Sequence, residues 1–144
     1  MKNFLLVGIC LLGLVFGGCK DDEDEVSPEV RVATNLTGTS EVPSNNSTAT
    51  GKAEGTFNND TKELKLTVTY QGVTPTGWHI HKAAAGTNGG VLFDFGTTFS
   101  SPFMFSKVLT LEQEADLKAG MYYVNIHSAT FKGGEIRGQL SVAP

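Results

Sequence analysis

The chain has 144 residues, two cysteines and a formal net charge of −4 at pH 7. This length accommodates one domain after an export signal, and the single cysteine beyond that signal excludes a disulfide framework. The sequence carries no basic stripe, which excludes a nucleic-acid partner bound through its phosphates.

The first 18 residues are typical of a bacterial lipoprotein signal. Lys2 gives a basic start, an apolar run covers residues 4–16, and two glycines stand directly before Cys19. This is the order of a secretory signal, and the run is shorter than the about 20 residues of a membrane-spanning helix. The pattern predicts a signal peptide over residues 1–18 and a lipidated Cys19 that anchors the mature protein to the membrane. A plain secretion signal is the alternative.

Residues 19–29 form an acidic segment between the anchor and the domain. Lys20 is followed by the acidic residues 21–25, and Glu29 lies just beyond them. A run of like charges cannot bury apolar surface, so the segment is expected to be a solvated tether. An acidic run directly after a lipidated cysteine also resembles the surface-export signal of certain bacterial lipoproteins. We therefore expect a protein of the bacterial outer membrane that faces outward, with a plain spacer as the alternative.

Apolar and polar residues alternate from Val30 onward, which predicts β-strands throughout the domain of residues 30–144. The clearest alternation covers residues 63–70, where leucine, valine and tyrosine side chains face one way. A segment rich in Ser, Thr, Asn and Pro is expected to be a loop over residues 38–50. The other predicted strands cover residues 30–36, 51–57, 77–82, 91–95, 103–109, 122–127 and 135–142.

One helical segment is expected, at residues 110–119. Thr110 is a candidate N-cap, Gln113 stands three residues later as in a capping box, and Gly120 ends the segment. Seven to eight short strands, frequent Gly and Asn turns and one short helix indicate an all-β, antiparallel fold. The strand count allows either a β-sandwich or a barrel.

Two of the three histidines lie two residues apart, in His79-Ile80-His81. Side chains two apart on a strand point to the same side, about 6.5–7 Å apart along the chain. His79 and His81 therefore share one face, while Trp78 and Ile80 enter the core on the other. Two imidazoles at this separation can converge on one metal ion.

The third histidine, His127, ends the predicted strand 122–127, on the face opposite its apolar side chains. If the two strands lie side by side, three neutral imidazoles meet, a donor set that suits zinc or copper and leaves a coordination position open. Asp94 is a candidate to complete the site or to orient a ligand histidine. The alternative is that the histidines only bond loop backbone.

Glu135 and Arg137 lie two residues apart on the last predicted strand and therefore share a face. They are expected to form a structural ion pair or to hold the loop that contains His127. No nucleophile elbow and no phosphate-binding glycine loop occur in the sequence, so no catalytic residue is assigned.

Five motifs in order resemble the CHRD domain family, which is known from chordin and from many bacterial secreted proteins. They are Leu36 to Pro43, Ala49 to Gly51, His79 to His81, Tyr123 to Ser128 and Gly133 to Leu140. The resemblance covers nearly the whole domain, from about Val30 to Val142. Two positions depart from the family pattern: Ser44 stands where a second proline is common, and Trp78 where a small residue is usual.

The resemblance implies an immunoglobulin-like or superoxide-dismutase-like β-sandwich. In chordin these domains belong to a protein that binds growth factors, and the bacterial members have no established activity. The motif residues carry over, without assigned roles, at Glu41, Pro43, His79, His81, His127, Glu135 and Arg137.

The segment from Gly77 to His81 is also similar to the copper-ligand strand of Cu/Zn superoxide dismutase. No histidine lies between His81 and His127, so the further ligands of a dinuclear site are missing. We therefore expect a non-catalytic module of the cell envelope that binds a protein, a glycan or a metal ion. A mononuclear copper or zinc enzyme is the alternative, and the sequence specifies no oligomeric state.

Overall fold

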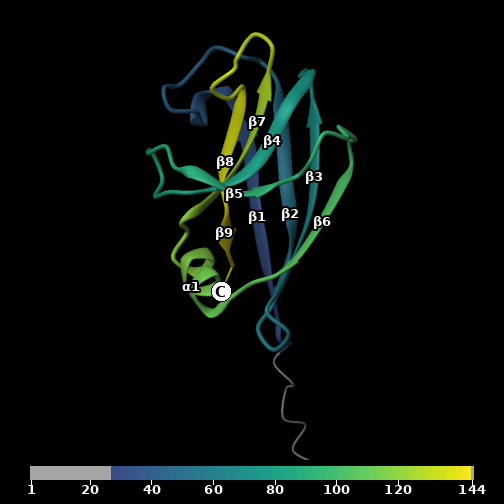
Figure 1. The fold of residues 1–144 in the computed structure, drawn as a ribbon, viewed down its shortest axis with the longest axis vertical. Coiled ribbons are helices and arrows are strands. Elements are labelled where there is room, and N and C mark those ends of the chain that lie inside the picture. Colours follow the sequence, from purple (N-terminus) through teal and green to yellow (C-terminus); the bar gives the residue numbers. More distant parts are fainter. Residues whose placement is uncertain (1–26, 144) are drawn as a thin grey trace, which may run out of the picture.

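Short antiparallel strands make up most of the computed structural model, which describes residues 27–143 (Figure 1). The strands are β1 (Glu29–Thr37), β2 (Thr50–Asn58), β3 (Glu63–Gln71), β4 (Pro75–Lys82), β5 (Gly90–Asp94), β6 (Phe103–Val108), β7 (Tyr122–Ser128), β8 (Ile136–Gln139) and β9 (Ser141–Val142). A 3-10 turn covers Gly38–Ser40 and a single α-helix, α1, covers Leu111–Lys118 within this part of the chain. The expected signal peptide, the anchor at Cys19 and most of the acidic tether lie outside the described residues.

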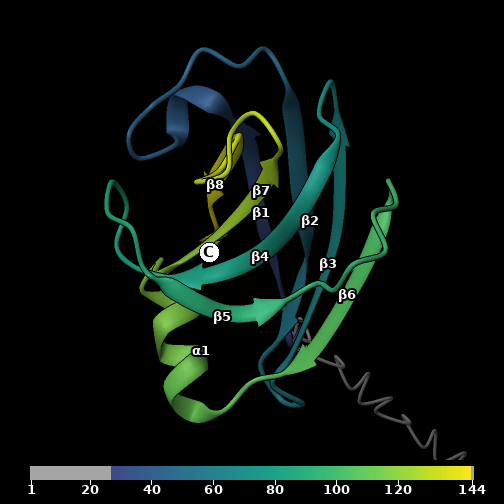
Figure 2. The ribbon, with the colours of Figure 1, turned by 45° about the horizontal axis from the view of Figure 1, so that its top comes forward.

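The strands of residues 27–143 form one antiparallel sheet in the order β5-β4-β7-β8-β1-β2-β3-β6, with β9 paired to β1. The sheet curls until its two end strands face each other, as Figure 2 shows. The Phe105 ring of β6 lies 5.6 Å from the Phe93 ring of β5 and 5.1 Å from the Phe95 ring just beyond it. The all-β antiparallel fold is confirmed, and the layers expected of a sandwich belong to one curled sheet.

Alternation of apolar and polar residues places the core inside the curl. On β3, Leu64, Leu66 and Val68 are buried, whereas Lys65 and Thr69 between and beside them are exposed. A strand that buries one face must alternate in this way, because its side chains point to opposite faces in turn. The predicted inward face of residues 63–70 is therefore confirmed.

Trp78 lies at the centre of the core and is fully buried. Its ring centroid is 4.5 Å from that of Phe103 and 5.7 Å from that of Phe95, and further aromatic rings surround it. Its indole N–H donates to the carbonyl oxygen of Gly96 at 3.0 Å, which satisfies the one polar atom of the ring. The prediction that Trp78 and Ile80 enter the core is confirmed.

Helix α1 begins as the sequence predicts. The Thr110 hydroxyl accepts from the backbone N–H of Gln113 at 3.2 Å, and the Gln113 side chain accepts from the backbone N–H of Thr110 at 3.0 Å. This reciprocal pair is the capping box. Gly120 follows the helix with a φ of 68°, a conformation that favours glycine. No helix among the described residues is both long enough and apolar enough to cross a bilayer.

The last predicted strand, residues 135–142, is divided into β8 and β9. β8 pairs with β7, β9 pairs with β1, and the backbone N–H of Leu140 between them donates to the carbonyl oxygen of Tyr122 at 2.8 Å. β8 also pairs with β1, where Arg137 lies opposite Thr37, so this last segment of the chain joins the two halves of the sheet. Gly138 permits the close approach of β8 to β1, because a Cβ there would lie 2.3 Å from the carbonyl oxygen of Asn35.

Candidate metal centre

The three histidines lie on two neighbouring strands of the sheet. In the antiparallel register of β4 and β7, Gly77 lies opposite His127, His79 opposite Asn125 and His81 opposite Tyr123. Residues opposite each other point to the same face, so all three imidazoles stand on the face that does not enter the core. Gly77 lies next to two of these rings: a Cβ there would be 3.4 Å from the His79 ring and 3.7 Å from the His127 ring, which is ordinary van der Waals contact.

The three imidazole rings converge. The ring centroids are 5.4 Å apart for His79 and His81, 5.1 Å for His79 and His127, and 6.3 Å for His81 and His127. One nitrogen from each ring lies within 4.8 Å of the others. Two nitrogens on a tetrahedral zinc ion stand about 3.3 Å apart, given zinc–nitrogen bonds of about 2.0–2.1 Å. The His79 Nδ1 to His127 Nε2 distance is 3.2 Å, so the predicted meeting of the third imidazole with the pair is confirmed.

Backbone carbonyls fix which nitrogen of two of the rings faces the centre. His81 Nδ1 lies 3.0 Å from the carbonyl oxygen of Gly89, and His127 Nδ1 lies 2.9 Å from that of Lys132. A carbonyl oxygen only accepts, so each Nδ1 carries the proton and each Nε2 has a free lone pair. Metal-ligating histidines are oriented in this way.

The donor set fits a cation in a further respect. The Nε2 atom of His81 is buried and has no hydrogen-bond partner within residues 27–143. Since His127 Nε2 carries a lone pair, His79 Nδ1 donates to it. An ion bound at His79 Nδ1 would require the His79 ring to carry its proton on Nε2 instead. The ligand atoms would then be Nδ1 of His79 and Nε2 of His81 and His127.

Burial favours the neutral form of His79 and His81. Desolvation lowers the pKa of His79, and the nearby His127 lowers it further, while the Asp94 carboxylate partly opposes both. Desolvation also lowers the pKa of His81, partly opposed by its bond to Gly89. A neutral imidazole is the form that binds a metal ion.

Asp94 is an exposed residue of β5 that lies directly opposite His79 in the register of β4 and β5. Its Oδ1 accepts from the backbone N–H of Gly96 at 2.7 Å. No hydrogen bond joins Asp94 to a histidine within the part of the chain that the structure describes. Asp94 therefore acts on His79 through its charge, and its predicted place in the metal site stays a prediction.

A stack of side chains supports His81 from the neighbouring strands. The Tyr123 ring is parallel to the His81 ring within 3°, at 4.8 Å, and the Arg137 guanidinium lies 3.4 Å from the Tyr123 ring centroid. Arg137 also donates to the Asn88 side chain at 3.0 Å and to the Thr87 carbonyl oxygen at 2.6 Å. The stack thus joins a metal-facing imidazole to the loop between β4 and β5. Tyr123 has no role predicted from the sequence, although its position two residues before Asn125 and four before His127 puts it on their face.

The ion pair expected between Glu135 and Arg137 does not occur among residues 27–143. Glu135 instead accepts from the Ser47 hydroxyl at 2.7 Å, and Arg137 holds the loop before β5. Both residues are buried. Loop 38–49 and the β7–β8 turn lie at the same end of the sheet (Figure 1). The two side chains diverge because each satisfies a different loop.

Glu41 and Pro43 lie beside the histidine face, the outer face of β4 and β7 that carries the three imidazoles. Neither residue belongs to the three-histidine group. The Glu41 carboxylate is buried and accepts from the Asn125 amide at 3.0 Å, and burial raises the pKa of Glu41. Pro43 is exposed and lines a cavity of about 310 Å³ together with Glu41, Phe131 and Lys132. This cavity adjoins the turn whose carbonyl orients His127.

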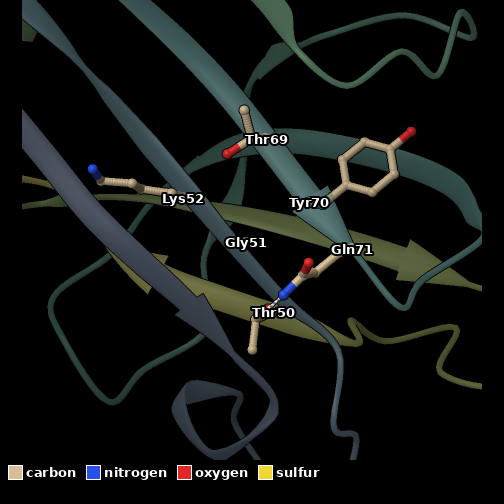
Figure 3. A pocket seen from close by; sticks show the side chains of 6 residues that line it. All are labelled: Thr50, Gly51, Lys52, Thr69, Tyr70 and Gln71. Atoms are coloured by element: carbon tan, nitrogen blue, oxygen red, sulfur yellow. Dashed lines mark hydrogen bonds between the residues drawn. The ribbon is translucent and has the colours of Figure 1, made fainter.

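A second hollow, of about 250 Å³, lies over β2 and β3. Figure 3 shows it around Gly51, with the Gln71 amide donating to the Thr50 hydroxyl at 3.1 Å. Lys52 is the one charged residue that lines it, and no histidine, cysteine or carboxylate does. The chemistry that could hold a metal ion is therefore at the histidine face of β4 and β7.

The model of one protein family, described as the CHRD domain, matches residues 32–140. The matched range contains all three histidines and the five motifs from Leu36 to Leu140. No curated protein and no solved structure matches the chain. The similarity of Gly77 to His81 to a superoxide dismutase strand gains no support from these comparisons and stays a prediction.

Proposed function

The chain belongs to the CHRD domain family, and we propose that its domain is a non-catalytic binding module with a mononuclear metal site at His79, His81 and His127. The observation that carries the metal site is the arrangement of the imidazole nitrogens. Two rings are held by carbonyls with Nε2 free, and the free Nε2 of His81 is buried without a partner in the described chain. A buried polar atom without a partner is rare and costs free energy, which a bound ion would recover.

Zinc or copper is the ion that we propose for this site. Neutral imidazoles suit both metals, and the described residues bring no thiolate to the three rings. With three protein ligands, the ion would retain an open coordination position at which a side chain of a protein partner, or a glycan oxygen, could bind.

We further propose that the module is displayed on the bacterial outer membrane through a lipid on Cys19 and the tether of residues 19–29. The lipobox-like residues before Cys19 and the acidic run after it support this location. Replacing the anchor residue (Cys19→Ser) is expected to move the protein from the membrane fraction to the soluble fraction, while Cys10→Ser leaves it in place. Retention of the Cys19→Ser protein in the membrane fraction would contradict the anchor.

Elemental analysis of the purified protein tests the metal site. After exposure to excess zinc or copper and removal of unbound ions, about one ion per chain is expected. The double variant His79→Ala/His81→Ala is expected to lose the ion, whereas Asn35→Ala, an exposed position on β1, serves as the matched control. Substoichiometric metal in the unaltered protein would remove the metal site from the proposal and leave the binding module.

A mononuclear copper enzyme is the second candidate function, and the open coordination position favours it. The discriminating experiment is a superoxide-dismutation assay of the copper-loaded protein. Activity well above that of the same concentration of free copper, lost in His127→Ala, would support the enzyme. Activity equal to that of free copper, or activity that persists without His127, would eliminate it.

A further inference from the structure

We infer that Asn125 is a further residue of the ion site, whose side-chain oxygen faces the bound ion as a neutral oxygen donor beside the three imidazoles. This inference rests on the proposed metal site. The inference gives a role to a residue that lies between the histidines in the sheet. It also limits the kinds of ion that the site can bind.

The sheet register brings Asn125 into the centre of the histidine face. Asn125 lies opposite His79 on β4 and opposite Arg137 on β8, two residues before His127 on the same face of β7. Its side chain is 3% exposed. A polar side chain in such a place requires partners for both its nitrogen and its oxygen.

Glu41 determines which way the Asn125 amide points. The Nδ2 atom of Asn125 donates to Glu41 Oε1 at 3.0 Å, and Gly134 packs so closely over this pair that a Cβ there would lie 2.2 Å from Nδ2. The opposite amide orientation would set two acceptor oxygens against each other while Glu41 is ionised. The Oδ1 atom therefore points away from Glu41.

The Oδ1 atom of Asn125 has no hydrogen-bond partner within residues 27–143, and it is buried. The only other buried side-chain atom without a partner in that range is Nε2 of His81. The two side chains are neighbours: burial is the main influence that lowers the pKa of His81, and the hydrogen bond that the Asn125 side chain would form with the charged ring opposes it. One oxygen and one nitrogen, both acceptors, thus remain unsatisfied in the same region.

The protein alone cannot satisfy both atoms with a neutral His81. With the proton on Nδ1, His81 bonds Gly89 and its Nε2 meets Asn125 as a second acceptor. With the proton on Nε2, the Nδ1 lone pair would instead face the Gly89 carbonyl oxygen. A cation between Nε2 and Oδ1 resolves the conflict, because it attracts both lone pairs at once.

The chemistry of the oxygen narrows the ion to a divalent one. An amide oxygen is a hard donor, whereas copper(I) is selected by soft thiolate and thioether ligands. Three neutral nitrogens and one neutral oxygen suit Zn²⁺, Cu²⁺ and the spectroscopic substitute Co²⁺. The Asn125 oxygen would occupy the fourth position of the ion, so an external ligand would bind by displacing this oxygen or as a fifth ligand.

Titration with Co²⁺ tests the inference, because its visible absorption reports both the donor atoms and the number of ligands. Two variants are compared with the unaltered protein: Asn125→Leu removes the oxygen, and Asn125→Asp keeps an oxygen and adds a negative charge. Asn35→Leu and Asn35→Asp make the same changes at an exposed position of β1. We expect Asn125→Leu to weaken Co²⁺ binding about 10–100-fold and to alter the absorption spectrum. Asn125→Asp is expected to bind at least as tightly as the unaltered protein, and both Asn35 variants to match it.

The thermal unfolding temperature, measured with chelator and with Co²⁺, provides a second readout. Asn125→Asp places a carboxylate beside Glu41, so its metal-free form is expected to unfold at a lower temperature and to gain more from Co²⁺ than the unaltered protein does. This measurement keeps the test decisive even if Asn125→Leu fails to fold.

The outcomes separate the inference from the proposed function. If the unaltered protein binds Co²⁺ but both Asn125 variants keep its affinity and spectrum, the role of Asn125 is wrong and the three-histidine site stands. If the unaltered protein gives no Co²⁺ spectrum at one ion per chain, the metal site and the role of Asn125 are both wrong.

Discussion

At the scale of single residues, His81 is the most constrained of the three imidazoles. It stacks on Tyr123, donates through Nδ1 to Gly89 and leaves a buried Nε2 without a partner in the described residues. The flanking chain thus fixes the position, the tautomer and the free lone pair of this ring. Because the His81 ring is already held in place, it loses less conformational entropy when it binds an ion.

The pH dependence of stability is the first prediction at this scale. The pKa values of His79 and His81 lie below the ordinary 6.5 in the folded, metal-free protein, so the unfolded state binds more protons than the folded state as pH falls below that value. Their contribution to stability is therefore present above about pH 6.5 and lost as pH falls towards the folded pKa values. The raised pKa of Glu41 acts in the opposite direction.

The two effects are separated by comparing variants. The free energy of unfolding of the metal-free protein is measured with denaturant at about pH 7.5 and about pH 5, on either side of about 6.5. Its decrease from the higher to the lower pH is expected to be smaller in His79→Ala/His81→Ala than in the unaltered protein. Glu41→Gln provides the control that removes the opposing carboxyl. An identical pH dependence in the double variant and the unaltered protein would contradict the lowered pKa values.

At the scale of elements, helix α1 and the loops around the histidine face illustrate two kinds of order. Helix α1 is held by its own capping box, a contact between residues three apart. The loop before β5 is instead held by Arg137, which is 49 residues from Asn88 and 50 from Thr87. Contacts of the first kind can be inferred from neighbouring residues, whereas contacts of the second kind require the whole sheet.

The capping box gives a prediction for one element. Replacing Thr110 with alanine removes the acceptor for the Gln113 N–H and is expected to lower the free energy of unfolding by about 1 kcal/mol. Thr97→Ala, in an exposed loop, is the matched control and is expected to change it by less than about 0.5 kcal/mol. Urea unfolding measures both, and equal effects would show that the cap contributes nothing.

At the scale of the whole molecule, the curled sheet separates an apolar interior from a polar outer face. β4 serves both, because Trp78 and Ile80 enter the core while His79 and His81 stand on the other side. The outer side chains are largely buried as well, since loops cover Asn125, Arg137 and Glu135. A well-packed core beneath a strand holds the side chains above it in place.

The core gives the third prediction. Trp78→Ala would remove the ring that contacts Phe95 and Phe103 and is expected to cost about 3–5 kcal/mol of stability. Met104→Ala, at a side chain that is 82% exposed, is expected to cost less than about 0.5 kcal/mol. Denaturant unfolding measures both variants. A loss of less than about 1 kcal/mol for Trp78→Ala would contradict its central place in the core.

Part of the candidate site could be predicted from residues close together in the chain. The spacing of His79 and His81 places them on one face, since a strand alternates with period two. The same rule puts His127 on the outer face of its strand. It does not say that β4 and β7 are neighbours, or that Gly77 rather than another residue lies opposite His127.

The all-β class, most strand positions, the capped helix and the inward face of each clear strand follow from the amino-acid sequence, because alternation and capping depend on residues a few positions apart. The meeting of three imidazoles, the separate partners of Glu135 and Arg137, and the place of Asn125 among the histidines follow from the folded sheet alone. These depend on strand register and loop contacts between residues far apart in the chain, such as His79 with His127, 48 positions apart, and Ser47 with Glu135, 88 positions apart. Local spacing carries no information on which distant strand supplies the partner.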